Sequence, residues 1–134
     1  QGLQWAYAMR NIVDPDGVKL AQDNCSSLGR WPIWHDSKKY LVDTNCYLIR
    51  RDIAVTHSPL WFRRYRDEIP PDYALCRALL DNHPKFDCTG LFSVNYRVEN
   101  SPLSMKREFY LEGNAAMEQR YPDGFPWTRK PADS

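Results

Sequence analysis

Residues 40–54 read YLVDTNCYLIRRDIA, and this stretch carries the densest strand signal of the chain. One apolar run opens it, the polar residues Asp43, Thr44 and Asn45 interrupt it, and a second apolar run follows before an arginine pair. Apolar runs rich in aromatic and branched residues favour a buried, central strand. Two interpretations of the interruption stay open. It is either a tight bend between two short strands, because Asp and Asn bond their own backbone, or a polar floor for a ligand.

The composition is that of an ordinary globular chain. Its 134 residues are 43% hydrophobic and 26% charged, and the net charge is +1. A chain of this length can bury a core without disulfides, and a charge this small provides no overall field for nucleic acid or an anionic membrane. No apolar run approaches the roughly 20 residues that a membrane helix needs. We therefore expect a single domain or domain fragment over residues 1–134, with 128–134 frayed, no nucleic-acid partner and no transmembrane segment.

The cysteines and the N-terminal sequence give information on the cellular compartment of the protein. The four cysteines are widely spaced and contain no C-x-x-C pair: Cys25, Cys46, Cys76 and Cys88. Such spacing suits neither a disulfide framework nor a zinc site, so we expect free thiols and no bound metal. The first five residues lack the basic-then-apolar layout of a signal peptide. These features predict a soluble, cytoplasmic protein, and the early strand signal predicts a fragment of a longer chain.

The N-terminal third predicts a hairpin followed by a long loop. Aromatic and apolar residues alternate with others over residues 4–13, which predicts a strand. The sequence Asp-Pro-Asp-Gly at 14–17 is typical of a turn, so residues 18–21 should return antiparallel. The loop at 22–39 holds Trp31 and Trp34. Long loops are often binding segments, although two tryptophans there could equally plug one side of the core.

The remaining elements complete a mixed α/β prediction. Residues 52–57 favour a short helix, and a clear amphipathic helix begins at Pro71 and ends at 82–84. Residues 86–98 predict one or two strands broken at Thr89-Gly90, and a last helix is expected from Ser101-Pro102 to Gly113. The fold class is therefore α/β: a small mixed sheet with an N-terminal hairpin and two to three helices.

Two aromatic segments allow more than one interpretation. Residues 61–66 read WFRRYR, where three arginines could contact phosphate, although the acids that follow favour a solvated face. Residues 121–127 read YPDGFPW, an ordered tail rich in aromatic side chains that could contact a protein partner.

Three motifs together resemble a known family. They read VDTNCYLIRRDIA at 42–54, PPDYALCRALL at 70–80 and FDCTGLFSVNYRV at 86–98. In order and spacing they are similar to the C-terminal, acceptor-side half of a family 2 glycosyltransferase with the nucleotide-diphospho-sugar transferase fold. The resemblance implies sugar transfer from a nucleotide-sugar to an acceptor hydroxyl. Asp72 occupies the place of the catalytic base, although Pro71 replaces the glutamate that precedes this base in the family. From its position alone, Asp72 could equally be an acid that stabilises the first turn of the helix.

The resemblance also implies roles for other residues. Trp31 and Trp34 would stack on a sugar face, Asp43 and Asn45 would bond hydroxyl groups, and Arg97 would contact phosphate. A divalent cation, Mg²⁺ or Mn²⁺, is implied, but the D-x-D motif of the family's nucleotide-binding half has no counterpart here. Its ligands should lie outside this chain, so the 134 residues alone should be inactive. The alternative is a non-catalytic interaction module or subunit of a larger assembly.

Overall fold

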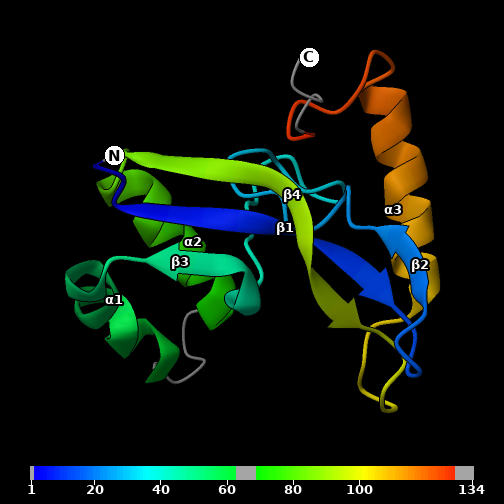
Figure 1. Cartoon of the computed structure of the whole chain (residues 1–134), viewed down its shortest axis with the longest axis horizontal. Helices are drawn as coiled ribbons and strands as arrows, with labels where there is room; N and C mark the ends of the chain where they lie inside the picture. Colours follow the sequence, from blue (N-terminus) through cyan, green and yellow to red (C-terminus); the bar gives the residue numbers. More distant parts are fainter. Residues whose placement is uncertain (1, 63–68, 129–134) are drawn as a thin grey trace.

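A four-stranded mixed sheet organises the chain, and β1 (Trp5–Val13) is its central strand. The strand β4 (Phe86–Arg97) runs parallel to β1 along its whole length and occupies one edge. The strands β2 (Lys19–Gln22) and β3 (Tyr47–Ile49) pair antiparallel with the two ends of β1 and therefore share its other edge. This arrangement confirms the predicted mixed fold (Figure 1). The computed structural model describes residues 2–62 and 69–128.

The predicted N-terminal hairpin is confirmed. The side chain of Asp14 accepts hydrogen bonds from the backbone N–H groups of Asp16 and Val18, at 2.9 and 2.8 Å. Gly17 has a φ of +84°, a conformation that residues with a Cβ rarely adopt. The local turn signals were therefore sufficient to define this corner of the fold.

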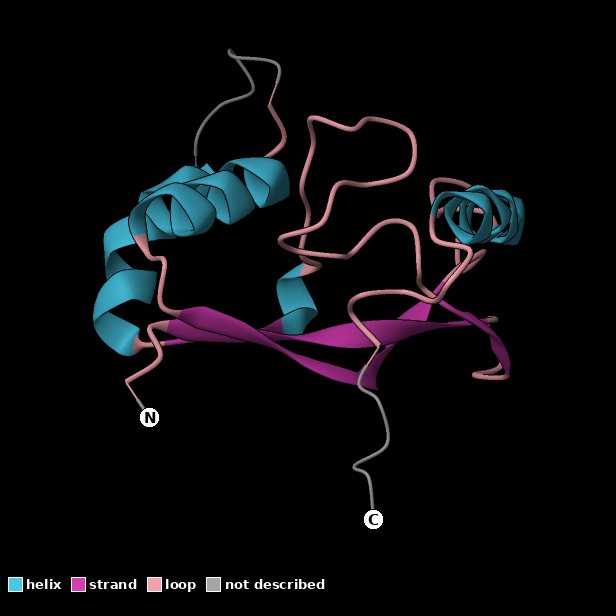
Figure 2. Ribbon diagram, turned by 90° about the horizontal axis from the view of Figure 1, so that it is seen from above, coloured by secondary structure: helices cyan, strands magenta, loops and turns pink. Residues whose placement is uncertain are grey.

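All the described helices lie on one face of the sheet (Figure 2). They are α1 (Arg51–His57), α2 (Pro71–Asn82) and α3 (Arg107–Arg120), together with the short 3-10 helices η1 (Thr44–Cys46) and η2 (Ser58–Phe62). Because the connection from β1 to β4 contains α1 and α2, it crosses over this face before the parallel strand begins. None of the helices among the described residues has the length and apolar content that a bilayer crossing requires.

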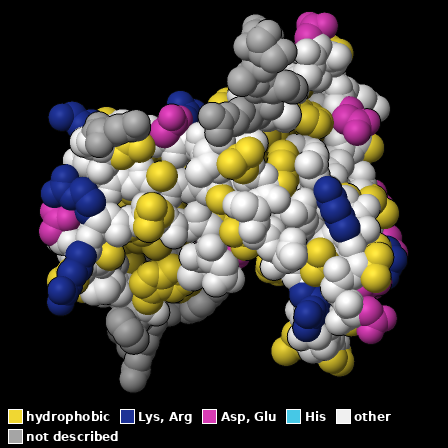
Figure 3. Space-filling view, viewed as in Figure 1, with side chains coloured by type: hydrophobic (Ala, Val, Ile, Leu, Met, Phe, Trp, Pro, Cys, Tyr) yellow, Lys and Arg dark blue, Asp and Glu magenta, His cyan; other side chains and the backbone are white. Residues whose placement is uncertain are grey.

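The opposite face of the sheet carries no helix among the described residues, and Figure 3 shows apolar side chains gathered over its middle. Ala6 lies opposite Leu48 in the antiparallel register, so both side chains point to this face. Leu48 is 76% exposed. We refer to this surface as the open sheet face.

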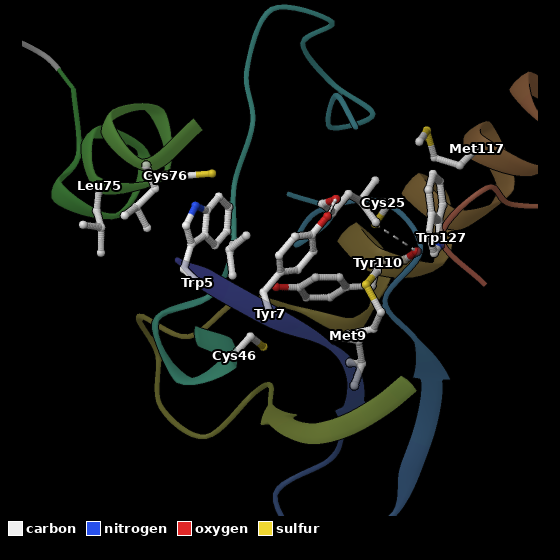
Figure 4. Packing of buried hydrophobic residues seen from close by; sticks show 14 of the residues in the cluster. Trp5, Tyr7, Met9, Cys25, Cys46, Leu75, Cys76, Tyr110, Met117 and Trp127 are labelled. Carbon is white, nitrogen blue, oxygen red and sulfur yellow. Dashed lines mark hydrogen bonds between the residues drawn. The ribbon is translucent and has the colours of Figure 1, made fainter. Parts of the chain in front are cut away.

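The core fills the space between the sheet and the helices. Trp5 and Tyr7 project from β1 towards them, and Figure 4 shows Trp5 beside Cys76 of α2. At the other end of the core, Met117 of α3 lies beside Trp127 from the C-terminal segment. All four cysteines are unpaired. Trp127 is only 2% exposed, so this side chain of the tail packs inward and is not part of a docking surface.

The stretch 40–54 does not form the central strand that its sequence predicts. Only Tyr47–Ile49 is a strand, and it lies at an edge of the sheet. Leu41 and Val42 are buried, yet their segment is irregular, and the carbonyl of Leu41 accepts a 2.8 Å bond from Gly29 in the preceding loop. The apolar side chains of this segment are therefore buried against a loop and not within a strand. The polar interruption forms η1, which agrees with the bend interpretation.

The last helix also differs from the prediction, because α3 begins at Arg107. The segment around Ser101 instead forms a turn, in which the backbone N–H of Ser104 donates to the carbonyl of Ser101. Gly113 does not end the helix. It is buried, and a Cβ there would lie 2.6 Å from both Cys25 Sγ and Trp34 Nε1. This glycine allows close packing rather than a helix end.

The other predicted elements are present. Both α1 and α2 occupy the expected segments, and β4 is one continuous strand with Gly90 at a φ of +68°. The arginine cluster at 63–66 and most of the expected frayed tail, 129–134, lie outside the described residues.

Candidate functional site

A cavity of about 320 Å³ lies between the N-terminal half of α2 and the segment that leads to η1. Three of its residues, Pro70, Tyr73 and Arg77, are spaced so that they share one face of the helix. Its other lining residues come from the facing segment and from the chain two residues before the helix: Lys38, Lys39, Tyr40 and Ile69.

The cavity wall combines aromatic rings with three cationic side chains, of which Lys39 and Arg77 form ion pairs and Lys38 forms none with a described residue. The ammonium group of Lys39 lies 5.7 Å from the ring centre of Tyr73 and 3.8 Å from the carboxylate of Asp36. Arg77 is held at 2.9 Å by Asp81, one helical turn further on. Paired charges reduce the field inside the cavity but still offer hydrogen bonds in fixed directions. Aromatic faces beside such groups suit a neutral, hydroxyl-rich ligand.

A second hollow of about 290 Å³ adjoins the first, since the two share Tyr40 and Arg77. Arg30 and Leu80 line its far side. Together the two hollows form a groove along α2.

Asp72 occupies the second position of α2, between the cavity residues Pro70 and Tyr73. Its side chain is half-buried, and Oδ1 accepts a 2.9 Å hydrogen bond from the backbone N–H of Tyr73. The second carboxylate oxygen accepts no hydrogen bond from any described residue. Successive helical residues are about 100° apart, so Asp72 stands beside the cavity rather than in its wall.

The neighbours of Asp72 are buried groups. Burial, then the nearby Cys76 and Asp72, raise the pKa of the Tyr47 hydroxyl. Burial also raises the pKa of the Cys76 thiol to about 11, with Asp72 contributing in the same direction. Both groups are therefore protonated at neutral pH.

Asp43 belongs to a different polar cluster, centred on Arg10. The guanidinium of Arg10 lies 2.6 Å from Asp23, 3.5 Å from Asp43 and 3.2 Å from the hydroxyl of Tyr110. It also stacks over the ring of Tyr96 at 4.1 Å. Burial alone would lower the pKa of Arg10, but the carboxylates, Asp23 foremost, raise it. Asp43 is thus an ion-pair partner, and no ligand is needed to explain it.

The alternation of β1 predicted Arg10 on the face opposite Met9, but both side chains are buried. The cause is two register shifts in the pairing with β4, one on each side of Met9. A shift of register changes the face to which a side chain points. The residues next to Arg10 in the sequence do not predict this change of face.

The remaining predicted binding residues are dispersed. Trp34 is half-buried, packs on Phe109 at 5.6 Å between ring centres and faces Gly113, so it plugs the core. Trp31 packs on Trp127 and lines a separate hollow beside β4. Asn45 is exposed on η1.

Arg97 lies at the end of β4, opposite Val13, and lines neither hollow of the groove. Of the predicted site residues, only Asp72 adjoins the cavity. The cavity residues themselves were missed, and the one sequence signal among them is the i,i+4 spacing of Arg77 and Asp81.

No cluster of three or more His, Cys, Asp or Glu side chains converges as metal ligands within residues 2–62 and 69–128. We therefore assign no step to a cation held by these residues. The chain matches no protein-family model, no curated protein and no solved structure.

Proposed function

We propose that this chain is the acceptor side of a glycosyltransferase, which moves a sugar from a nucleotide-sugar to an acceptor hydroxyl with Asp72 as general base. The observation that carries the proposal is the place of Asp72 beside a cavity with two tyrosine rings, with one carboxylate oxygen that accepts no hydrogen bond from the described residues. The order of the three sequence motifs supports it independently.

In the proposed reaction Asp72 accepts one proton. As the acceptor oxygen attacks the anomeric carbon, its proton passes to the carboxylate. The new carbon–oxygen bond forms as the bond to the nucleoside diphosphate breaks, and the electron pair leaves with the diphosphate. In this proposal the acceptor lies along the groove of α2, while the donor and its cation are held by residues outside this chain.

The test is Asp72→Asn in the full-length protein that contains these residues, assayed with nucleotide-sugars, acceptors and Mg²⁺ or Mn²⁺. We expect turnover to fall by about a hundredfold or more with donor binding retained, because only proton removal is lost. The matched control is Asp52→Asn, which changes the same residue type at the second position of α1, outside the lining of the groove, and should keep near wild-type turnover. An Asp72→Asn enzyme with more than about a third of wild-type turnover would contradict the role of the base.

The second candidate is a non-catalytic module that docks on a partner, and the open sheet face favours it. A shallow hollow of about 320 Å³ there is lined by Leu3, Ala6, Leu48 and Ile49 among others. Exposed apolar surface of this kind commonly marks an interface. If the full-length protein transfers no sugar from any nucleotide-sugar, and Leu48→Lys abolishes an assembly that Asp72→Asn leaves intact, the module is the better description.

A further inference from the structure

A third hollow continues the groove of α2 at Arg30. Arg30 lines the second hollow of the groove, which also holds Arg77 and Asp81. The same side chain lines a hollow of about 580 Å³ beside β4, together with Trp31 and Asp87. Pockets for small organic ligands measure about 300–1,000 Å³, and each of the three hollows is close to or within that range. The three hollows therefore lie in series along one side of the molecule.

The second and third hollows contain the same polar unit, an exposed arginine–aspartate pair. Arg77 lies 2.9 Å from Asp81 in the second hollow, and Arg30 lies 2.8 Å from Asp87 in the third. In each pair, one carboxylate oxygen accepts no hydrogen bond from the described residues. Each pair therefore offers N–H donors and an oxygen acceptor side by side, with little net charge.

Aromatic side chains lie at both ends of this series. Tyr40 and Tyr73 line the first hollow, and Trp31 lines the third. The guanidinium of Arg30 stacks on the ring of Trp31, at 5.0 Å from its centre. A sugar unit has hydroxyl groups that both donate and accept hydrogen bonds, and C–H faces that pack on aromatic rings. A ligand that repeats this combination along its length is an oligosaccharide.

The distances along α2 require more than one sugar unit. Asp72 and Asp81 lie on the same helix, about 14 Å apart along its axis. This separation is larger than one sugar ring. The carboxylate of Asp87 belongs to the next hollow. A single sugar whose hydroxyl group lies at Asp72 would therefore reach neither Asp81 nor Asp87.

We propose that the acceptor is an uncharged oligosaccharide of several units that occupies all three hollows. The hydroxyl group that attacks the donor lies beside Asp72. The rest of the chain runs past Arg77 and Asp81, and then past Arg30 and Asp87, towards Trp31. This inference rests on the proposed function and names the class of its acceptor.

An extended peptide does not fit the third hollow in the same way. A peptide that joins a sheet edge as a new strand requires a row of free backbone N–H groups. Along this part of β4, the N–H groups of Cys88, Gly90 and Leu91 already donate to nearby side chains, at 2.8, 3.4 and 3.2 Å. The ligand is therefore recognised through side chains, as a hydroxyl-bearing chain would be.

The test measures KM of the full-length enzyme for the disaccharide and the hexasaccharide of three uncharged series: the cello-, chito- and malto-oligosaccharides. In the series that serves as acceptor, the hexasaccharide should have a KM at least about tenfold lower, because only the longer chain meets both ion pairs. Asp87→Asn should raise the hexasaccharide KM about tenfold, because a charged acceptor is lost, and leave the disaccharide KM unchanged.

The matched control is Asp52→Asn. Asp52 forms an equally exposed pair with Arg50, at 2.7 Å, and lines none of the three hollows. This variant should keep the wild-type difference between the two acceptor lengths. Circular dichroism of both variants shows whether each retains the fold.

Three results with an active enzyme would overturn the inference and leave the proposed function standing. They are an equal KM for short and long acceptors, a loss of length dependence in Asp52→Asn as large as in Asp87→Asn, and transfer to other acceptors but to none of the three series. If the full-length protein transfers no sugar, the proposed function fails, and calorimetry with the three hexasaccharides decides the inference. Binding that Asp87→Asn weakens about tenfold supports an oligosaccharide site, and no binding overturns it.

Discussion

Two arginine–aspartate pairs of similar length have opposite surroundings. Arg10 and Asp23 are 2.6 Å apart with side chains 4% and 0% exposed. Arg77 and Asp81 are 2.9 Å apart with side chains 63% and 56% exposed. A buried charge that loses its partner is strongly destabilising, whereas an exposed pair contributes little. The first pair therefore maintains the fold, and the second is free to meet a ligand.

The buried pair also organises backbone. Asp23 accepts hydrogen bonds from the N–H groups of Cys25, Ser26 and Ser27, so one carboxylate holds both Arg10 and the start of the long loop. Among the described residues, Arg77 is the hydrogen-bond donor to the Asp81 side chain, and no comparable set of backbone donors surrounds it. The two pairs differ both in burial and in the number of hydrogen bonds that the aspartate accepts. The substitutions below separate these two effects.

The largest effect is expected from Asp23→Asn. The variant leaves Arg10 buried without its closest counter-charge. It also places an amide N–H group, a hydrogen-bond donor, against the N–H donors that the carboxylate had accepted. The free energy of unfolding should therefore fall by about 3–5 kcal/mol. Urea denaturation followed by tryptophan fluorescence measures it. A loss under about 1 kcal/mol would mean that burial does not distinguish the two pairs.

An intermediate effect is expected from Asp43→Asn. Asp43 is 3.5 Å from Arg10, its side chain is 15% exposed, and Arg10 keeps Asp23 when the charge is removed. We expect a loss of about 1 kcal/mol in the same urea experiment. If Asp43→Asn destabilises as much as Asp23→Asn, proximity to Arg10 matters more than burial and the number of bonds.

The smallest effect on stability is expected from Arg77→Ala. An exposed i,i+4 pair stabilises a helix by about 0.3–0.5 kcal/mol, so the urea midpoint should hardly move. If the groove holds the acceptor, KM for the acceptor should rise in the full-length enzyme while donor binding is unchanged. A variant with unchanged acceptor KM would remove Arg77 from the proposed site, and a large loss of stability would contradict the comparison.

The parts of the fold that were predictable depend on neighbours in sequence. The turn at 14–17 and the limits of α2, set by Pro71 and Pro84, need only local backbone preferences. The central strand was misassigned because the apolar residues around Leu41 are buried by a loop, which an apolar run does not distinguish from a strand. The start of α3 was missed because the cap-like Ser101 bonds Ser104 in a turn instead.

The candidate site was less predictable than the fold. Tyr40 and Tyr73 meet at one cavity only after the crossover brings their segments together, and neither sequence context suggests this. The burial of Arg10 depends on register shifts against a strand that begins more than 70 residues later. Asp72 could be predicted as a site residue because the start of a helix is recognisable from neighbouring residues, and the family resemblance implied its role as the base.

The parallel pairing of β1 with β4 has a consequence for how the chain folds. Trp5 pairs with Phe86, so the central strand acquires one of its neighbours only after a closure of about 80 residues. The hairpin with β2 needs fewer than 20 and should form first. During synthesis at about 5–20 residues per second, one edge of an aromatic-rich strand therefore stays unpaired for several seconds. We expect aggregation of nascent or refolding chains through this edge, and slow refolding typical of pairings distant in sequence.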